Sequence, residues 1–232
     1  MGMFKIIVLI LLIPALLIGQ KKEETKFQKA SKYFFQKKFE MAELLLREEL
    51  KDNPENRKAY SYLGDIMLQK GQYDAAIELY KKAVDLDPSS AEEEFRLGQA
   101  YYAKKLGNVA VDHYKKALQK NPNLKYAYFH LGLSNLMLLR DKSETIRNWE
   151  EYLRAAPEDP QYEKIRRAIE LLKDPNFKIP PPDSDIPIEE ILHLGGDILK
   201  ATEKKDSAES AGHEDKKTVK QLEDIYRDDD LN

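Results

Sequence analysis

The chain has 232 residues, no cysteine and a formal net charge of −3. The absence of cysteine excludes disulfides, thiolate metal sites and cysteine nucleophiles, and the near-balanced charge lacks the basic excess that favours nucleic acid binding. The length suffices for one well-buried domain with tails, because domains commonly run to about 100–200 residues.

The first 20 residues are strongly apolar. Lys5 precedes an apolar run over Ile6–Ile18, which Pro14 interrupts. A short positive start followed by such a run is typical of a secretory signal, whereas a membrane-spanning helix usually needs about 20 apolar residues. We expect residues 1–20 to be a cleaved signal peptide or an uncleaved membrane anchor that tethers the chain through residues 4–18. A helix buried in the domain is the third interpretation.

Residues between the apolar start and the C-terminal tail repeat with a period of 34. The same residue type recurs three times at this spacing in four series: Ala42, Ala76 and Ala110; Pro54, Pro88 and Pro122; Leu63, Leu97 and Leu131; Gly64, Gly98 and Gly132. Self-similarity at a fixed period of this size is the signature of stacked structural repeats.

Each repeat contains two helical stretches, and the second repeat shows them best. Apolar residues recur at helical spacing over Arg57–Lys70 and over Tyr73–Leu86, with Gly71 in the turn between them. Pro88 ends the second stretch, because proline removes a backbone donor and opposes a helical conformation in its predecessor. Small residues such as Gly64 allow the helices to approach closely. Stacking several hairpins then builds one continuous core.

These positions resemble the tetratricopeptide repeat family, with units at residues 23–56, 57–90, 91–124 and 125–158. The resemblance implies an all-α solenoid of four helix-turn-helix repeats. The fourth unit departs from the pattern: one extra residue in its turn places the bulkier Thr145 and Tyr152 where small residues are expected. Such departures are expected of a terminal repeat that packs against a different next layer.

The chain continues beyond the repeats in three parts. Residues 160–173 are predicted to form a capping helix, and the proline-rich residues 174–187 a linker or a strap along the surface. Residues 188–232 are predicted to be a largely disordered tail that contains two amphipathic segments, Ile188–Leu199 and Asp215–Asp230. Each segment has the anchor spacing of a helix that binds in a groove, or is a solvated stretch with incidental apolar residues.

No catalytic residue, metal site or cofactor site is predicted. The four histidines, His113, His130, His193 and His213, lack a second metal ligand at a useful helical spacing. Gly132–Leu133–Ser134 begins like a nucleophile elbow, but it lacks the second glycine and lies in a helical stretch. We therefore do not expect an enzyme.

The resemblance also implies a partner-binding groove, because first helices line the concave face of tetratricopeptide solenoids. The positions implied as groove residues are Phe27, Ser31, Phe34, Lys58, Ser61, Asp65, Gln69, Glu92, Phe95, Gln99, Tyr102, Tyr126, Phe129, Leu133 and Met137. Family members that bind chaperone tails use a Lys, Asn and Arg clamp, which Ser31, Asp65 and Gln99 do not reproduce, so no chaperone-tail binding is expected. The apolar residues of the third and fourth units are expected to be exposed, with the alternative that half of them belong to the core.

The sequence thus predicts a non-enzymatic scaffold for protein–protein interaction. We expect a bacterial protein that is exported to the periplasm, or anchored in the inner membrane facing it, and that serves envelope assembly. Two other functions stay open: self-association through the open ends of the repeat array, and a regulatory subunit of a membrane enzyme or transporter. A segment of a partner protein, or the chain's own Ile188–Leu199, is expected to cover the groove.

Overall fold

A computed structural model describes residues 24–181. The predicted signal or anchor, the amphipathic segments at 188–199 and 215–230, and the rest of the tail therefore lie outside the described residues. Between residues 24 and 181 all regular secondary structure is helical, with no strand. No helix of this part combines the length and apolar character that crossing a membrane requires.

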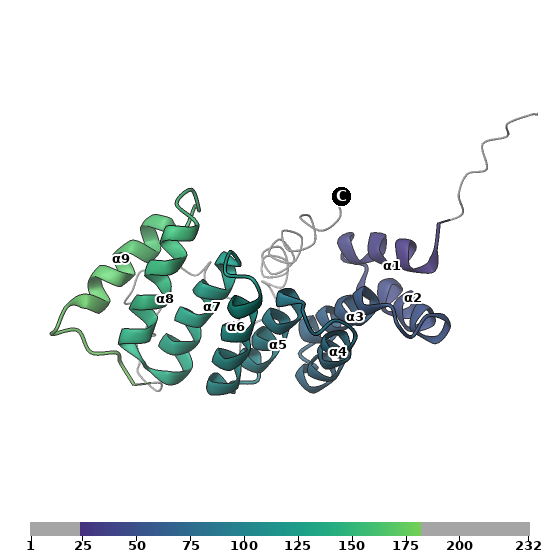
Figure 1. Cartoon of the computed structure of the whole chain (residues 1–232), viewed down its shortest axis with the longest axis horizontal. Coiled ribbons are helices and arrows are strands. Elements are labelled where there is room, and N and C mark those ends of the chain that lie inside the picture. The colour runs from purple at the N-terminus through teal and green to yellow at the C-terminus, as the bar shows by residue number, and fades with distance from the viewer. Residues whose placement is uncertain (1–23, 182–232) are drawn as a thin grey trace, which may run out of the picture.

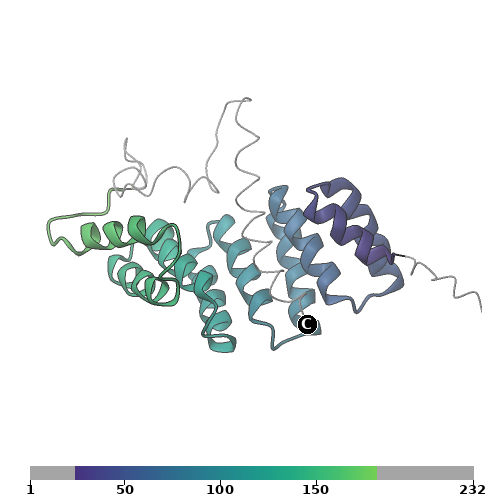
Figure 2. The same ribbon diagram turned by 90° about the horizontal axis from the view of Figure 1, so that it is seen from above.

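The helices follow one another along the long axis of the molecule, from α1 at one end to α9 at the other (Figures 1 and 2). Four hairpins and a final helix make up the array: α1 Lys26–Phe35, α2 Phe39–Asp52, α3 Arg57–Gln69, α4 Tyr73–Leu86, α5 Ala91–Ala103, α6 Gly107–Lys120, α7 Lys125–Ser134 extended by the π-helix η1 Asn135–Leu139, α8 Lys142–Ala155, and α9 Tyr162–Lys173. The helices of the second hairpin begin and end within one residue of the ranges expected from the sequence, and α9 begins two residues after the start of the expected capping helix at 160–173.

The first three hairpins turn in the same way. The residue after each first helix's C-cap has a positive φ: Lys37, Gly71 or Lys105. The next amide then donates back into the helix, as in the 2.8 Å bond from the Gln72 amide to the Met67 carbonyl. This is the Schellman arrangement, which satisfies carbonyls that the end of a helix would otherwise leave unpaired.

A glycine–aromatic contact sets the spacing of the two helices in the last three hairpins. A Cβ atom added to Gly64 would lie 2.5 Å from the Tyr80 ring, and one added to Gly98 would lie 2.5 Å from the Tyr114 ring. At Gly132 the ring is that of Trp149, at 2.2 Å. Real Cβ atoms do not approach so closely, so only glycine allows these rings to pack on the first helix.

The apolar side chains form two clusters along the array. The N-terminal core cluster extends from Ala30 in α1 to Ala100 in α5, and the C-terminal core cluster extends from Phe95 in α5 to Leu172 in α9. The capping helix α9 contributes four buried residues to the second cluster: Ile165, Ala168, Ile169 and Leu172. Each cluster therefore joins several hairpins, as the stacking of repeats requires.

The residues after α9 form a strap that packs back on the array. Phe177 and Ile179 lie against the C-terminal core cluster. The Lys142 ammonium group, at the start of α8, donates to the carbonyls of Asp174 at 2.7 Å and Phe177 at 3.1 Å. Residues 174–181 thus behave as the surface strap that was one of the two predictions for this segment.

The extra residue of the fourth hairpin lies in the helix, not in the turn as expected from the sequence. It widens the end of the first helix into η1, after which Arg140 takes a left-handed conformation. The side chains of Leu138 and Leu139 pack on Gly107, where an added Cβ atom would lie 2.8 Å and 2.9 Å from them. The equivalent residues of the preceding second helices are Phe39 and Tyr73. Gly107 therefore provides the space that the π-helix occupies.

We predict that Gly64→Ala lowers the free energy of unfolding by about 1–3 kcal/mol, because overpacking a filled core has a cost of this size. Its Cβ would collide with the buried Tyr80 ring. Urea denaturation of Gly64→Ala, Tyr80→Leu and the double variant measures the effect. The first hairpin carries Ala30 and Leu46 at these two positions, so the double variant should lose less than the sum of the single losses. Additive losses would contradict the contact.

Candidate functional site: the concave surface

The first helices of successive hairpins lie on the inner side of the array. α1 contacts α3, α3 contacts α5, and α5 contacts α7. Within the described part of the chain, the successive second helices α2, α4, α6 and α8 make fewer contacts with one another than the first helices do. Helices converge on the inside of a curved stack and diverge on its outside. The concave surface is therefore the one lined by α1, α3, α5 and α7.

Of the fifteen positions implied as groove residues, the structure places fourteen on α1, α3, α5 or α7, and Met137 on η1. Partly exposed members are Phe27, Ser31, Lys58, Gln69, Glu92, Gln99, Tyr126 and Met137. Buried members are Phe34, Ser61, Asp65, Phe95, Tyr102, Phe129 and Leu133. The expectation that the apolar residues of the third and fourth units are exposed is therefore wrong for Phe95, Tyr102, Phe129 and Leu133. These four belong to the C-terminal core cluster.

Aromatic rings fill the N-terminal end of the concave surface. Tyr62 of α3 stacks on Phe34 of α1, with ring centroids 4.8 Å apart, and on Phe27 at 5.6 Å. Phe35 meets the same tyrosine edge-on at 6.0 Å. We call Phe27, Phe34, Phe35 and Tyr62 the N-terminal aromatic cluster. Phe27 and Phe35 stay partly exposed, so this cluster presents aromatic surface that a partner can contact.

A second group of rings lies at α5–α8. His130 of α7 lies 5.2 Å from Phe95, 5.4 Å from Phe129 and 5.6 Å from Tyr114 (ring centroids). Phe129 in turn stacks on Trp149 at 6.4 Å. These neighbours are the reason that Phe95 and Phe129 are buried. We call these five residues the C-terminal aromatic cluster.

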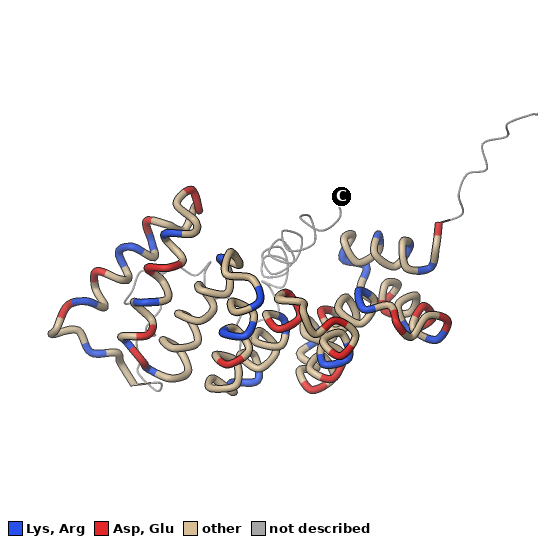
Figure 3. Tube along the Cα trace, viewed as in Figure 1, with Lys and Arg blue, Asp and Glu red and all other residues tan. Residues whose placement is uncertain are grey.

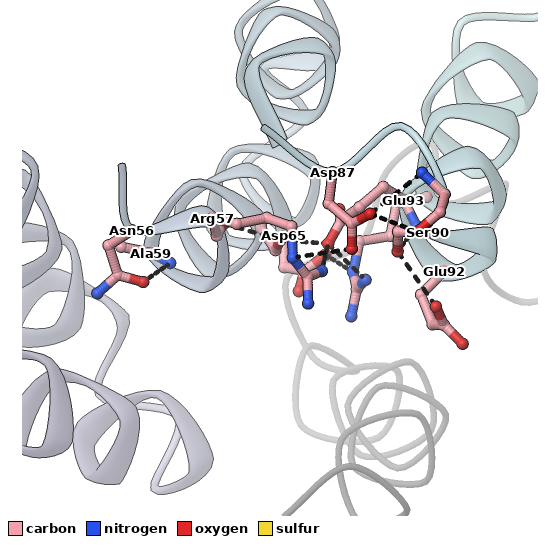
Figure 4. Close-up of polar contacts among 11 residues, drawn as sticks. Asn56, Arg57, Ala59, Asp65, Asp87, Ser90, Glu92 and Glu93 are labelled. Atoms are coloured by element: carbon pink, nitrogen blue, oxygen red, sulfur yellow. Dashed lines mark hydrogen bonds and ion pairs between the residues drawn. The ribbon is translucent and has the colours of Figure 1, made fainter. Parts of the chain in front are cut away.

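A cluster of charges joins α3 to α5 (Figure 4). The Arg96 guanidinium is 3.5 Å from the Asp65 carboxylate and 3.3 Å from the Glu93 carboxylate. Glu93 Oε1 also accepts from Arg57 at 2.7 Å and from the Ser61 hydroxyl at 2.6 Å. The side chains of Asp65 and Glu93 are 0% exposed and that of Arg96 is 2% exposed. Buried charges are tolerated only when they are paired in this way. We call Arg57, Asp65, Glu93 and Arg96 the central charge cluster.

The tyrosine that packs on Gly64 also joins this cluster. The Tyr80 hydroxyl donates to Asp65 Oδ1 at 2.6 Å. Burial raises the pKa of Tyr80 well above its usual value, and the Asp65 carboxylate raises it further, so the hydroxyl stays protonated as a donor. The second helix α4 thereby fixes a carboxylate on the concave side of α3.

Ser61 and Asp65 were among the predicted groove residues, whereas Arg57, Glu93 and Arg96 were not. The signal that could have found two of them is a departure from the repeat. Glu93 stands where the second and fourth repeats have Ala59 and Ala127, both buried. Arg96 stands where the same repeats have Tyr62 and His130. A charged residue in a register of buried alanines needs a partner in the fold.

Another polar group lies between α5 and α6. Glu94 stands where the neighbouring repeats have Tyr60 and Tyr128, and its carboxylate accepts from Lys120 at 2.8 Å and contacts His113 Nδ1 at 2.7 Å. Burial raises the pKa of Glu94, but the bonds from Lys120 and His113 outweigh that and lower the pKa overall.

Among residues 24–181, no three His, Asp or Glu side chains come together as metal ligands do. Figure 3 shows both signs of charge on most helices, whereas α7 is nearly uncharged.

Comparison with known proteins agrees with this architecture. Residues 64–105 match the model of the TPR repeat family. Two crystal structures of MamA are similar. The first shares 26% identity over 62% of this chain and 81% of its own, with a TM-score of 0.56. The second shares 26% identity over 63% and 78%, with a TM-score of 0.57.

A mutant O-GlcNAc transferase of Thermobaculum terrenum shares the fold at 22% identity and a TM-score of 0.53. The alignment covers 56% of this chain but only 25% of the transferase. No curated protein matches the chain.

We predict that Tyr80→Phe lowers the free energy of unfolding by about 1.5–3 kcal/mol, the range for hydrogen bonds to charged groups. The matched control is Tyr114→Phe, one repeat later. Both rings are fully buried, but the Tyr114 hydroxyl has no hydrogen-bond partner among residues 24–181. The control should lose no stability, because it only removes an unpaired buried hydroxyl. Equal losses in urea denaturation would contradict the role of the Tyr80–Asp65 bond.

A second prediction concerns pH. Burial among aromatic rings lowers the pKa of His130 from its ordinary 6.5 to about 4. Between these two pH values the unfolded chain binds a proton that the folded chain does not, so stability falls as the pH falls. This loss, no more than about 3 kcal/mol at pH 4, should be absent from His130→Phe. Urea denaturation at pH 7.5, 6 and 5 compares the variants, and an identical pH dependence would show that His130 is not responsible.

Proposed function

We propose that this protein is a non-enzymatic scaffold for protein–protein interaction, supported by the match of residues 64–105 to the TPR repeat family and by the similar MamA structures. It binds a segment of a partner protein on the concave surface of α1, α3, α5 and α7. Repeat arrays of this kind typically mediate such interactions, because each hairpin adds a strip to an extended concave surface.

The observation that carries this proposal is the row of partly exposed aromatic and polar side chains along the concave surface. Asp65, Glu93 and Arg96 of the central charge cluster, and most rings of the C-terminal aromatic cluster, are buried beneath it. Partly exposed Phe27 and Tyr126 lie near opposite ends of this surface, with the polar Gln69 and Gln99 between them. The partner segment therefore has apolar anchors on both sides of a charged or hydrogen-bonding group, in a helical or extended form.

The proposed location is the bacterial cell envelope, either in the periplasm or tethered to the inner membrane. Its support is the apolar run Ile6–Ile18, which Lys5 precedes. If residues 1–20 stay attached as an anchor, the scaffold is held at a membrane, where it serves as a regulatory subunit of a membrane complex.

Self-association through the ends of the array has less support. The strap brings Phe177 and Ile179 against the C-terminal core cluster, and Lys142 holds it there through two backbone carbonyls. Apolar surface of the last layer is therefore already occupied by the chain itself. Stacking a second copy on this end would require displacing the strap.

Photo-crosslinking in cells tests the scaffold function. A photoreactive phenylalanine analogue at Tyr126 reports on the concave surface, since this side chain is partly exposed on α7, whereas Phe129 is buried against Trp149 and Tyr152. The matched control carries the analogue at Glu78, which is exposed on the second helix α4.

We expect products with other proteins from position 126 at a yield well above that from position 78, and mass spectrometry of the products identifies the partner. Equal yields from the two positions would argue against a concave binding surface.

A further inference from the structure

We propose that residues 215–232 of this same chain bind along the concave surface as a helix, with their acidic end against α1 and α3. The inference rests on the concave surface being a binding surface, as proposed above, and it adds an occupant from within the chain. The scaffold then exchanges its own tail for a partner segment. A partner must therefore bind the concave surface more favourably than the tail does.

Charge complementarity is the first argument. Residues 24–181 carry 28 basic and 25 acidic residues, whereas residues 182–232 carry 7 basic and 15 acidic residues. The folded array and the segment that follows it therefore have opposite net charges. Opposite charges within one chain attract over about 10 Å at 0.1 M salt, which favours docking of the segment on the array.

The charges on the concave helices also give the segment a direction. α1 and α3 together carry five basic residues and one acidic residue, whereas α5 and α7 carry two basic and three acidic residues. Lys26 and Arg57 are paired with Asp52 and Glu93, whereas Lys29 and Lys32 of α1 are exposed. The segment has three consecutive acidic residues, Asp228–Asp230, near its end. Its acidic end therefore fits the half of the surface formed by α1 and α3.

The apolar pattern of the segment matches the aromatic surface. Val219, Leu222 and Tyr226 recur at the spacing of one helical face, and residues 215–232 contain no glycine or proline. Negative charge at a helix C-terminus opposes the helix dipole, so a helix that ends in Asp228–Asp230 gains stability from a basic surface. The other amphipathic segment, Ile188–Leu199, fits less well, because Gly195 and Gly196 interrupt it.

The chain can reach the surface from where the strap ends. Lys142 fixes the strap at the start of α8, and 33 residues, 182–214, separate Pro181 from the segment. Helices pack about 8–10 Å apart, so five helix spacings from α8 to α3 span about 40–50 Å. Thirty-three residues reach about 110 Å when extended, and their root-mean-square length as a flexible chain is about 30 Å.

The absence of native cysteine allows a direct test in the full chain. One cysteine replaces Asn232 and a second replaces Gln69, which is partly exposed on α3, and a short bismaleimide joins them. The matched control pairs Asn232→Cys with Glu78→Cys on α4. Because docking raises the effective concentration at one surface only, the Gln69 pair should give about tenfold more intramolecular product. Asp228→Asn/Asp229→Asn/Asp230→Asn, or 0.5 M NaCl, should reduce this excess several-fold, since screening is then nearly complete.

Equal yields from the two pairs would overturn the inference, and so would a product of twice the chain mass, which would identify a second copy as the occupant. The result is separable from the scaffold function. If the cysteine pairs give equal yields while the analogue at Tyr126 captures another protein, the tail proposal fails and the scaffold stands. If the Gln69 pair alone reacts and position 126 captures no other protein, the tail occupies the surface and the scaffold proposal fails.

Discussion

In each of the last three hairpins, an aromatic ring of the second helix lies on a glycine of the first, at a distance that leaves no room for a Cβ atom. Interiors are packed so tightly that one added carbon is felt, and the glycine therefore fixes how closely the two helices approach. In the first hairpin, Ala30 occupies the position of the glycine and Leu46 the position of the aromatic residue. Both are fully buried.

The same contact organises the polar centre of the concave surface. Tyr80 can reach Asp65 because its ring lies on Gly64, the residue next to that carboxylate. Asp65 then neighbours Arg96 on the next hairpin, and Arg96 also contacts Glu93 of its own helix α5. Packing within one hairpin thus positions the charge that links it to its neighbour. The cost of removing such charges from water offsets much of their attraction, and here the group joins α3 of the second repeat to α5 of the third.

The repeat period predicted the helices, the turns and the small positions, because these depend on contacts that every hairpin makes in the same way. Exposure on the concave surface could not be predicted equally well. Whether Phe95 or Phe129 is buried depends on His130, Trp149 and Tyr152 of the following hairpin, and these are the residues in which the repeats differ. The inserted residue of the fourth hairpin was visible in the sequence, but its place in η1 was not, because the space for it comes from Gly107 on another hairpin.

The division of the apolar residues into two core clusters has a consequence for how this array loses its structure. Repeat arrays unfold as coupled neighbouring units, and their cooperativity weakens where the coupling between units is poor. The ionic group of Asp65, Glu93 and Arg96 lies where the two clusters meet. Trp149, the only tryptophan of the chain, lies in the C-terminal core cluster. Tryptophan fluorescence therefore follows the loss of that half alone, whereas circular dichroism follows all the helices, and the separation of the two transitions measures how strongly the halves are coupled.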